Sequence, residues 1–111
     1  MRHARLVASV TAASVLLSVA ALAEVDKKTE RLWKAQCASC HGQGGKGDTD
    51  VGKQMKVQDM TTAAFQAKKD DELKNAITNG AKSDSGKMDP FKDLTPDQVN
   101  SLIALMRSFK K

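Results

Sequence analysis

Apolar residues recur at helical spacing along the second half of the chain. The clearest run lies at the C-terminus, where apolar residues recur with the three- and four-residue spacing of one helix face: Val99, Leu102, Ile103, Met106 and Phe109. Thr95 and Gln98 flank Pro96 with the spacing of a capping box, so a helix is predicted from residue 96 onward. Another helix is predicted over residues 70–79, because acidic residues favour its start and the glycine that follows favours its end.

The remaining segments are shorter and less regular. Asp26 can cap a first helix that runs into the cysteines at 37 and 40. A glycine-rich polar loop is predicted over residues 42–59, followed by a short helical turn at 62–66. Residues 81–94 are predicted to be a loop, and no stretch alternates convincingly as a strand. The chain is therefore predicted to be all-α.

Residues 1–23 have the pattern of a signal peptide. Arg2 and Arg5 precede an uncharged run of 18 residues that ends in the small-x-small sequence Ala21-Leu22-Ala23. An uncleaved anchor is the alternative, but many Ser, Thr and Ala residues make this run only weakly apolar. Cleavage after Ala23 is expected to leave a periplasmic domain of residues 24–111 with no firm membrane anchor.

Composition limits what this domain can be. A chain of 111 residues with 4% aromatic residues can build one small domain with a marginal core, which something else must complete. Multi-domain enzymes and repeat proteins are excluded by length. The net charge of +5 falls to +3 without the leader, and no basic cluster with interleaved aromatic residues is present. Nucleic-acid binding is therefore not expected.

The segment Cys37-Ala38-Ser39-Cys40-His41 carries the candidate chemistry. Its C-x-x-C-H spacing is the attachment signature of c-type haem. Positions i, i+3 and i+4 share one face of a helix, so both thiols can add to the haem vinyl groups while His41 ligates the iron. Covalent attachment also retains the haem outside the cytoplasm. One covalent haem c is therefore the predicted cofactor.

Other interpretations of these cysteines fit less well. A redox-active dithiol normally occurs where a strand leads into a helix, and the sequence shows no such strand. A zinc site needs a fourth ligand, yet no Cys or His beyond Cys37, Cys40 and His41 remains once the leader is removed. An inert thiol pair does not suit an oxidising compartment. Residues 42–47 match G-x-G-x-x-G but follow no strand, so they predict a tight turn beside the haem rather than a dinucleotide site.

The second axial ligand of the iron must be another residue type, since His41 is the one histidine after the leader. Four methionines are available: Met55, Met60, Met88 and Met106. Met106 belongs to the last apolar stripe, Met60 is interpreted as a buried anchor, and Met55 has no evident role. Met88 lies in a loop shaped by Gly86 and Pro90 and is the predicted ligand, with Lys87 or a vacant position as alternatives. A His/Met pair leaves no open position for a substrate, which favours a carrier over an enzyme.

The residues together resemble the small bacterial class I cytochromes c. The resemblance covers essentially all of residues 24–111 and rests on Leu32-Trp33, the haem motif with Gly42, Met88-Asp89-Pro90-Phe91 and the segment 102–108. It implies an all-α fold in which the terminal helices cross near right angles, with Trp33 and Leu102 at their contact. It also implies thioethers at Cys37 and Cys40, the proximal ligand at His41, the distal ligand at Met88, and a soluble electron carrier.

Three departures from that family pattern bear on the structure. Thr29 replaces a usual glycine of the first helix, so the helix crossing must loosen or shift. Leu105 replaces the usual aromatic residue of the last helix. No proline between His41 and Gly80 can accept the proximal imidazole N–H, so a carbonyl near residues 50–53 is expected to do so.

The leading hypothesis is a periplasmic monohaem carrier that passes single electrons between redox proteins. One alternative is the cytochrome subunit of a dehydrogenase or oxidase complex. Another is a haem-based ligand sensor with an open sixth position.

Overall fold

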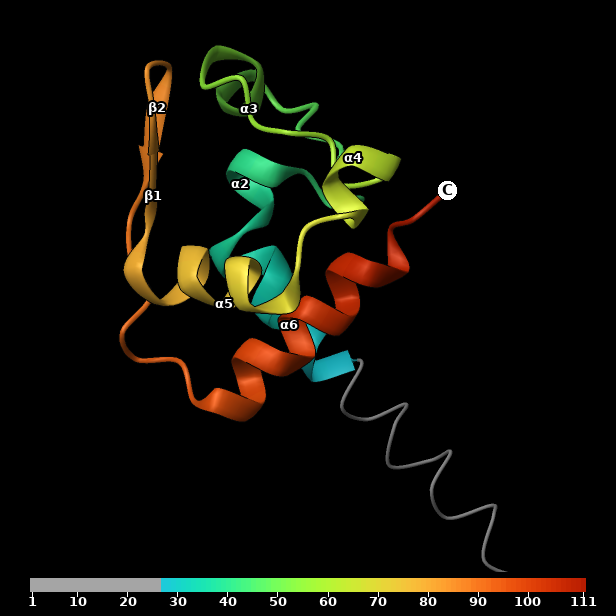
Figure 1. Cartoon of the computed structure of the whole chain (residues 1–111), viewed down its shortest axis with the longest axis vertical. Helices are drawn as coiled ribbons and strands as arrows, with labels where there is room; N and C mark the ends of the chain where they lie inside the picture. The colour runs from blue at the N-terminus through green and yellow to red at the C-terminus, as the bar shows by residue number, and fades with distance from the viewer. Residues whose placement is uncertain (1–26) are drawn as a thin grey trace, which may run out of the picture.

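The structure is a computed structural model that describes residues 27–111; the leader and the predicted cap Asp26 lie outside these residues. Helices joined by loops make up most of the described chain, and one small hairpin stands at its edge (Figure 1). A first helix over residues 27–36 is followed in order by α2 (Ala38–His41), α3 (Asp50–Gln54), α4 (Ala63–Gln66), α5 (Asp70–Asn79), β1 (Ala81–Ser83), β2 (Gly86–Met88) and α6 (Pro96–Ser108).

Helix α6 confirms the prediction from the apolar stripe. The Gln98 amide N–H donates to the Thr95 hydroxyl at 3.2 Å, and the Thr95 amide N–H donates to the Gln98 side chain at 2.9 Å. This capping box satisfies two amides that the first turn leaves without helical partners. The predicted apolar positions of the helix are buried: Val99, Leu102, Ile103 and Met106.

Helices α4 and α5 also lie where the sequence predicts them. The Thr62 hydroxyl accepts the Phe65 amide N–H and caps α4, and Gly80 ends α5 at a φ of 83°. Arg107 of α6 joins both helices, because its guanidinium donates to the Gln66 carbonyl at 3.0 Å and to the Asp70 carboxylate at 2.7 Å. The turn between α4 and α5 is thereby attached to the end of α6.

Two predictions about loops are wrong. Residues 81–94 contain an antiparallel hairpin in which Ala81 pairs with Met88 across a two-residue turn. Its strands have three residues each and β1 is exposed, so too few positions exist for an alternating pattern to show. Residues 42–59 contain α3, a five-residue helix that begins at a Thr49 cap and has no apolar stripe.

The core lies where α6 crosses in front of the first helix (Figure 1). Trp33 and Leu102, which the family resemblance places at this contact, are 2% and 1% exposed. Phe109, just after α6, meets Trp33 edge to face with the ring centroids 5.3 Å apart. The aromatic partner that Leu105 does not supply therefore comes from one helical turn further along the chain.

Candidate functional site

The C-x-x-C-H segment forms a single helical turn that is set off from the first helix at Cys37. The Cys37 carbonyl accepts the amide N–H groups of Cys40 at 3.3 Å and of His41 at 3.0 Å. Gly42 then ends α2 with a φ of 79°, a backbone conformation that glycine adopts without a steric penalty. This short turn has the i, i+3, i+4 geometry that the sequence predicts for the two thiols and the imidazole.

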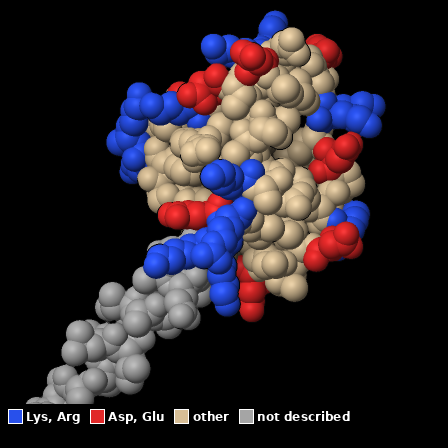
Figure 2. Space-filling model, turned by 180° about the vertical axis from the view of Figure 1, so that it is seen from behind, with Lys and Arg blue, Asp and Glu red and all other residues tan. Residues whose placement is uncertain are grey.

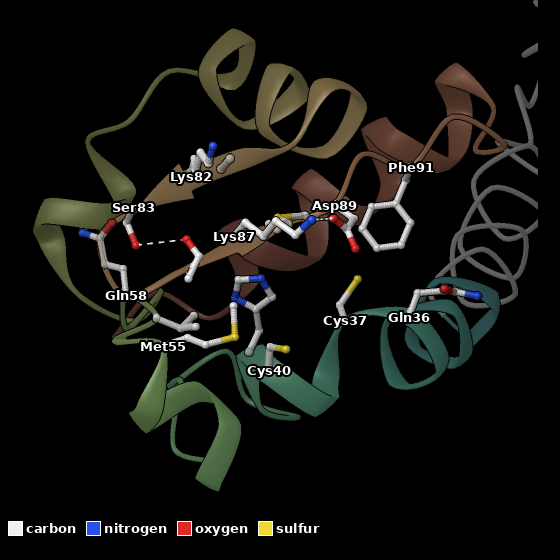
Figure 3. Close-up of a pocket in the computed structure, with 15 residues that line it drawn as sticks. Gln36, Cys37, Cys40, Met55, Gln58, Lys82, Ser83, Lys87, Asp89 and Phe91 are labelled. Carbon is white, nitrogen blue, oxygen red and sulfur yellow. Dashed lines mark hydrogen bonds and ion pairs between the residues drawn. The ribbon is translucent and has the colours of Figure 1, made fainter.

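All four predicted site residues line one cavity of about 360 Å³. Figure 3 shows the cavity between α2 and the hairpin, with Cys37 and Cys40 on the helical wall and Lys82 and Lys87 on the hairpin. Residues that are far apart in the sequence thus share one space: Cys37, Cys40, His41 and Met88.

A second cavity of about 220 Å³ adjoins the first on the inner side of the molecule. His41 and Met88 line both cavities. The walls of the inner one are mostly apolar and include Met60, Phe65, Leu73, Ile77 and Met106. The two predicted iron ligands therefore stand at the boundary between the outer and the inner cavity.

His41 is held in its neutral form. Burial lowers the pKa of its imidazole, and an uncharged ring nitrogen is the form that binds a metal. The Trp33 ring lies beside the imidazole with the centroids 5.8 Å apart, and its indole N–H donates to the Gly42 carbonyl at 3.0 Å. Trp33 thus joins the core to the ring that is expected to ligate the iron.

The expected acceptor for the His41 ring is not found. Nδ1 of His41 is buried and has no hydrogen-bond partner among residues 27–111. The carbonyls of Val51, Gly52 and Lys53 already accept the amides of Met55, Val57 and Lys56. The described residues therefore do not show the predicted bond between the proximal imidazole N–H and a carbonyl of this segment.

Helix α3 braces the backbone of the motif instead. The Thr49 hydroxyl donates to the Ser39 carbonyl at 2.8 Å and accepts the Gly52 amide N–H at 2.9 Å. Gly52 packs against the Cys40 carbonyl so closely that a side chain there would overlap it. This contact positions the C-terminal end of α2, where His41 lies.

The surroundings of Cys37 do not favour a reactive thiolate. Burial, with a smaller contribution from Cys40, raises the pKa of the Cys37 thiol to about 11, whereas reactive dithiols have a lowered pKa. Within residues 27–111, no group of three or more His, Cys, Asp or Glu side chains could hold a metal ion. Neither the dithiol nor the zinc interpretation is therefore favoured by the structure.

Met55 is the cavity residue whose role the sequence did not indicate. It follows α3 directly and lines the outer cavity opposite the hairpin. The other two methionines are buried in the inner cavity wall, as the predictions of a loop anchor for Met60 and a core position for Met106 require.

The chain matches the family described as cytochrome c oxidase, cbb3-type, subunit III, over residues 24–106. It belongs to this family of c-type cytochromes. A solved structure, the KustC0563 c-type cytochrome, is 32% identical, has a TM-score of 0.65, and is matched over 75% of this chain and 98% of its own. No curated protein sequence matches at a significant level.

This small monohaem cytochrome c has the class I fold, and its family binds haem c covalently. The residues present fit that group, since two thiols and a neutral imidazole face a cavity that continues into an apolar space. When bound, haem supplies reversible one-electron chemistry at its iron. No helix within residues 27–111 is long and apolar enough to cross a membrane.

Proposed function

We propose that the chain is an exported electron carrier that binds one haem c through Cys37 and Cys40 and holds the iron between His41 and Met88. The observation that carries this proposal is that His41 and Met88, from different elements, line both cavities. Two side chains at this boundary could both hold the iron of a haem bound there.

This ligand pair suits electron transfer. A thioether sulfur is a soft, neutral donor that favours ferrous iron, and His/Met ligation raises the potential. With both positions filled, the coordination changes little between oxidation states, and no position remains for a substrate. Most side chains around the inner cavity are apolar and would reduce the access of water to the ligands. The proposed function is thus that of an electron carrier and not of an enzyme.

The proposed partners are redox proteins that approach the outer cavity. Charges at its hairpin wall have both signs, and Lys87 pairs with Asp89 at 3.5 Å. Exposed basic residues gather on the first helix, away from this wall: Lys27, Lys28, Arg31 and Lys34. Figure 2 shows basic side chains beside the start of the described chain and mixed charges elsewhere on that face. Close fit, more than long-range attraction, would then select the partner.

Export is part of the proposal. Residues 1–23 would direct secretion and be removed, so that the domain of residues 24–111 acts in the periplasm. The intact mass of protein from a periplasmic extract should equal that of residues 24–111 plus one haem. A mass that includes the leader would support an anchored protein instead.

Absorption spectra of the purified protein in both redox states test the proposed function. The ferric protein should show the far-red sulfur-to-iron band, and the ferrous protein should not bind carbon monoxide at neutral pH. Rapid carbon monoxide binding by the native protein would contradict the carrier and support the ligand sensor.

The family's description favours one further candidate, a cytochrome subunit of an oxidase complex. The size of the native haem protein distinguishes the two. A carrier elutes from gel filtration as a single small domain, whereas a subunit elutes with a much larger complex extracted from membranes.

A further inference from the structure

Met55 and Gly86 bring the two walls of the outer cavity into contact. A Cβ atom added at Gly86 would lie 2.7 Å from Cε of Met55, 3.0 Å from its Cγ and 3.3 Å from its Cβ. Met55 thus occupies the space that any larger residue at position 86 would need. Figure 3 shows Met55 on the same side of the cavity as Ser83 and Gln58, at the end away from Cys37.

Gly86 and Met88 belong to the same strand and the same face. Both lie in β2, two residues apart, and residues at that spacing point to one side of a strand. Met55 therefore packs against the face from which the Met88 side chain projects. A contact at Gly86 bears directly on where Met88 is held.

The hairpin needs such a contact. An isolated two-stranded hairpin is marginally stable in water, and each strand here has only three residues. Within its turn, the Ser83 hydroxyl donates to the Gly86 carbonyl at 3.3 Å, a long bond between exposed groups. Support for β2 must therefore come from side chains packed against it.

The backbone next to Met55 has an unusual conformation that directs this residue toward the cavity. Lys56 has a φ of 53°, and it is the one residue other than glycine with a positive φ among residues 27–111. This left-handed turn ends α3, and the Val57 amide N–H then donates to the Gly52 carbonyl at 2.9 Å. As a result, Met55 and Val57 on either side of Lys56 both line the cavity. Unfavourable conformations of this kind persist where the surrounding structure requires them.

We propose that Met55 is a positioning residue that clamps the hairpin through Gly86 and so holds Met88 at the iron. This inference rests on the proposed His41/Met88 ligation. Met55 itself is not a ligand in this account. Its contribution is to reduce the freedom of β2 and thereby the rate and extent of Met88 dissociation.

The first test measures how easily imidazole displaces Met88 from the ferric protein, followed at the far-red band. Met55→Ala should retain the band but bind imidazole about tenfold more tightly, equivalent to about 1.4 kcal/mol of lost Met88 binding. Met55→Leu, which keeps the apolar volume, should restore the native affinity. Hydrogen exchange of the amides at 81–88 should become faster in Met55→Ala and stay at the native rate in Met55→Leu.

A double-mutant cycle tests the contact itself. Gly86→Ala should also strengthen imidazole binding, because its methyl group displaces Met55. In a Met55→Ala background the same change should have no further effect, since the space is then free. Gly44→Ala is the matched control, because nothing lies within 4 Å of a Cβ at that glycine, and it should leave imidazole binding unchanged.

Native imidazole affinity and native exchange rates in both Met55→Ala and Gly86→Ala would overturn the clamp. Additive effects in the double mutant would also overturn it. If Met55→Ala abolishes the band while Met88→Ala retains it, Met55 is a ligand and both proposals are wrong. If the native protein lacks the band, the ligation fails, and the exchange rates alone decide whether Met55 holds the hairpin.

Discussion

Cys37 and Cys40 lie one helical turn apart and face the same cavity, but their surroundings differ. Cys37 is buried at the junction of two helices, while Cys40 is partly exposed. Neither thiol is paired in a disulfide, so each is available to form a thioether. The motif's spacing was enough to predict this arrangement, because one helical turn fixes it locally.

Replacing both cysteines tests the attachment. Cys37→Ala combined with Cys40→Ala should leave no haem on the protein after denaturing electrophoresis, because the chain has no other thiol. Each single variant keeps one thioether site and should retain stained protein at a lower level. Haem staining at the band of the double variant would refute thioether attachment.

Asp59 gives a prediction for the effect of pH on stability. The Thr61 hydroxyl and the Thr61 amide N–H both donate to its carboxylate, at 2.7 and 2.8 Å, and they lower its pKa below the ordinary value of an aspartate. Because the pKa is lower in the folded state, these bonds stabilise the protein at pH values above the unfolded-state pKa. That stability is lost as the pH falls through the folded-state pKa. The bond orders the turn that leads into the buried Met60.

Asp59→Asn should therefore lower the Tm at pH 7 and lower it less near pH 3. Thermal unfolding of both proteins by circular dichroism across this range measures the difference. Thr62→Val is a useful comparison, since it removes a neighbouring cap whose contribution should not vary with pH. A Tm difference between Asp59→Asn and the native protein that is constant with pH would contradict the assignment.

Helices and strands with a capping motif or an apolar stripe in their sequence could be predicted, and those without such a pattern could not. Helix α6 has a capping box and a four-residue apolar stripe, and its start was predicted to the residue. The hairpin has three-residue strands, and α3 has five residues with one buried position, so neither has a periodic pattern long enough to detect. The hairpin lines the cavity, and α3 packs against α2 through Gly52 and the Cys40 carbonyl.

Arg107 gives a prediction for how α6 is joined to the rest. Its planar guanidinium donates to the carboxylate of Asp70 and to the carbonyls of Gln66 and Lys68 at once. Arg107→Lys keeps the charge but cannot reach all three acceptors, so it should reduce the free energy of unfolding by about 1–3 kcal/mol. Urea denaturation measures this loss.

Lys110→Ala provides the control for Arg107→Lys. Lys110 is exposed beyond the end of α6, and its removal should change the unfolding free energy by less than about 0.5 kcal/mol. Equal stability of Arg107→Lys and the native protein would show that the three acceptors are satisfied by water instead.

At the scale of the whole molecule, the described chain encloses a substantial space with few large side chains. The outer and inner cavities measure about 360 and 220 Å³ and meet at His41 and Met88. Apolar walls that face such a space lose dispersion contacts unless something fills it. Haem would supply much of the interior surface that the low aromatic content cannot.

The haem-free chain should therefore be largely unfolded. Far-ultraviolet circular dichroism of the protein made without haem should show little helix, and heating should produce no cooperative transition. The intact haem protein under the same conditions provides the control. A native-like cooperative transition in the haem-free chain would show that the protein core is sufficient.

Some residues of the site could be placed from the sequence and others could not, for physical reasons. Cys37, Cys40 and His41 lie within one helical turn, so local spacing alone predicts their common direction. Met88 could be proposed by eliminating the other methionines, but its place in the wall of the cavity that His41 also lines depends on the hairpin. Met55 reaches the cavity only through the left-handed turn at Lys56, which no local pattern indicates.

The most direct test of the account is the far-red sulfur-to-iron band of the ferric protein in four single variants. Met88→Ala should abolish this band, lower the reduction potential and allow the ferrous protein to bind carbon monoxide, because the sixth position is then open. Met55→Ala, Met60→Ala and Met106→Ala should each retain the band if the variant folds. A Met88→Ala protein that keeps the band and still excludes carbon monoxide would contradict the proposed ligation.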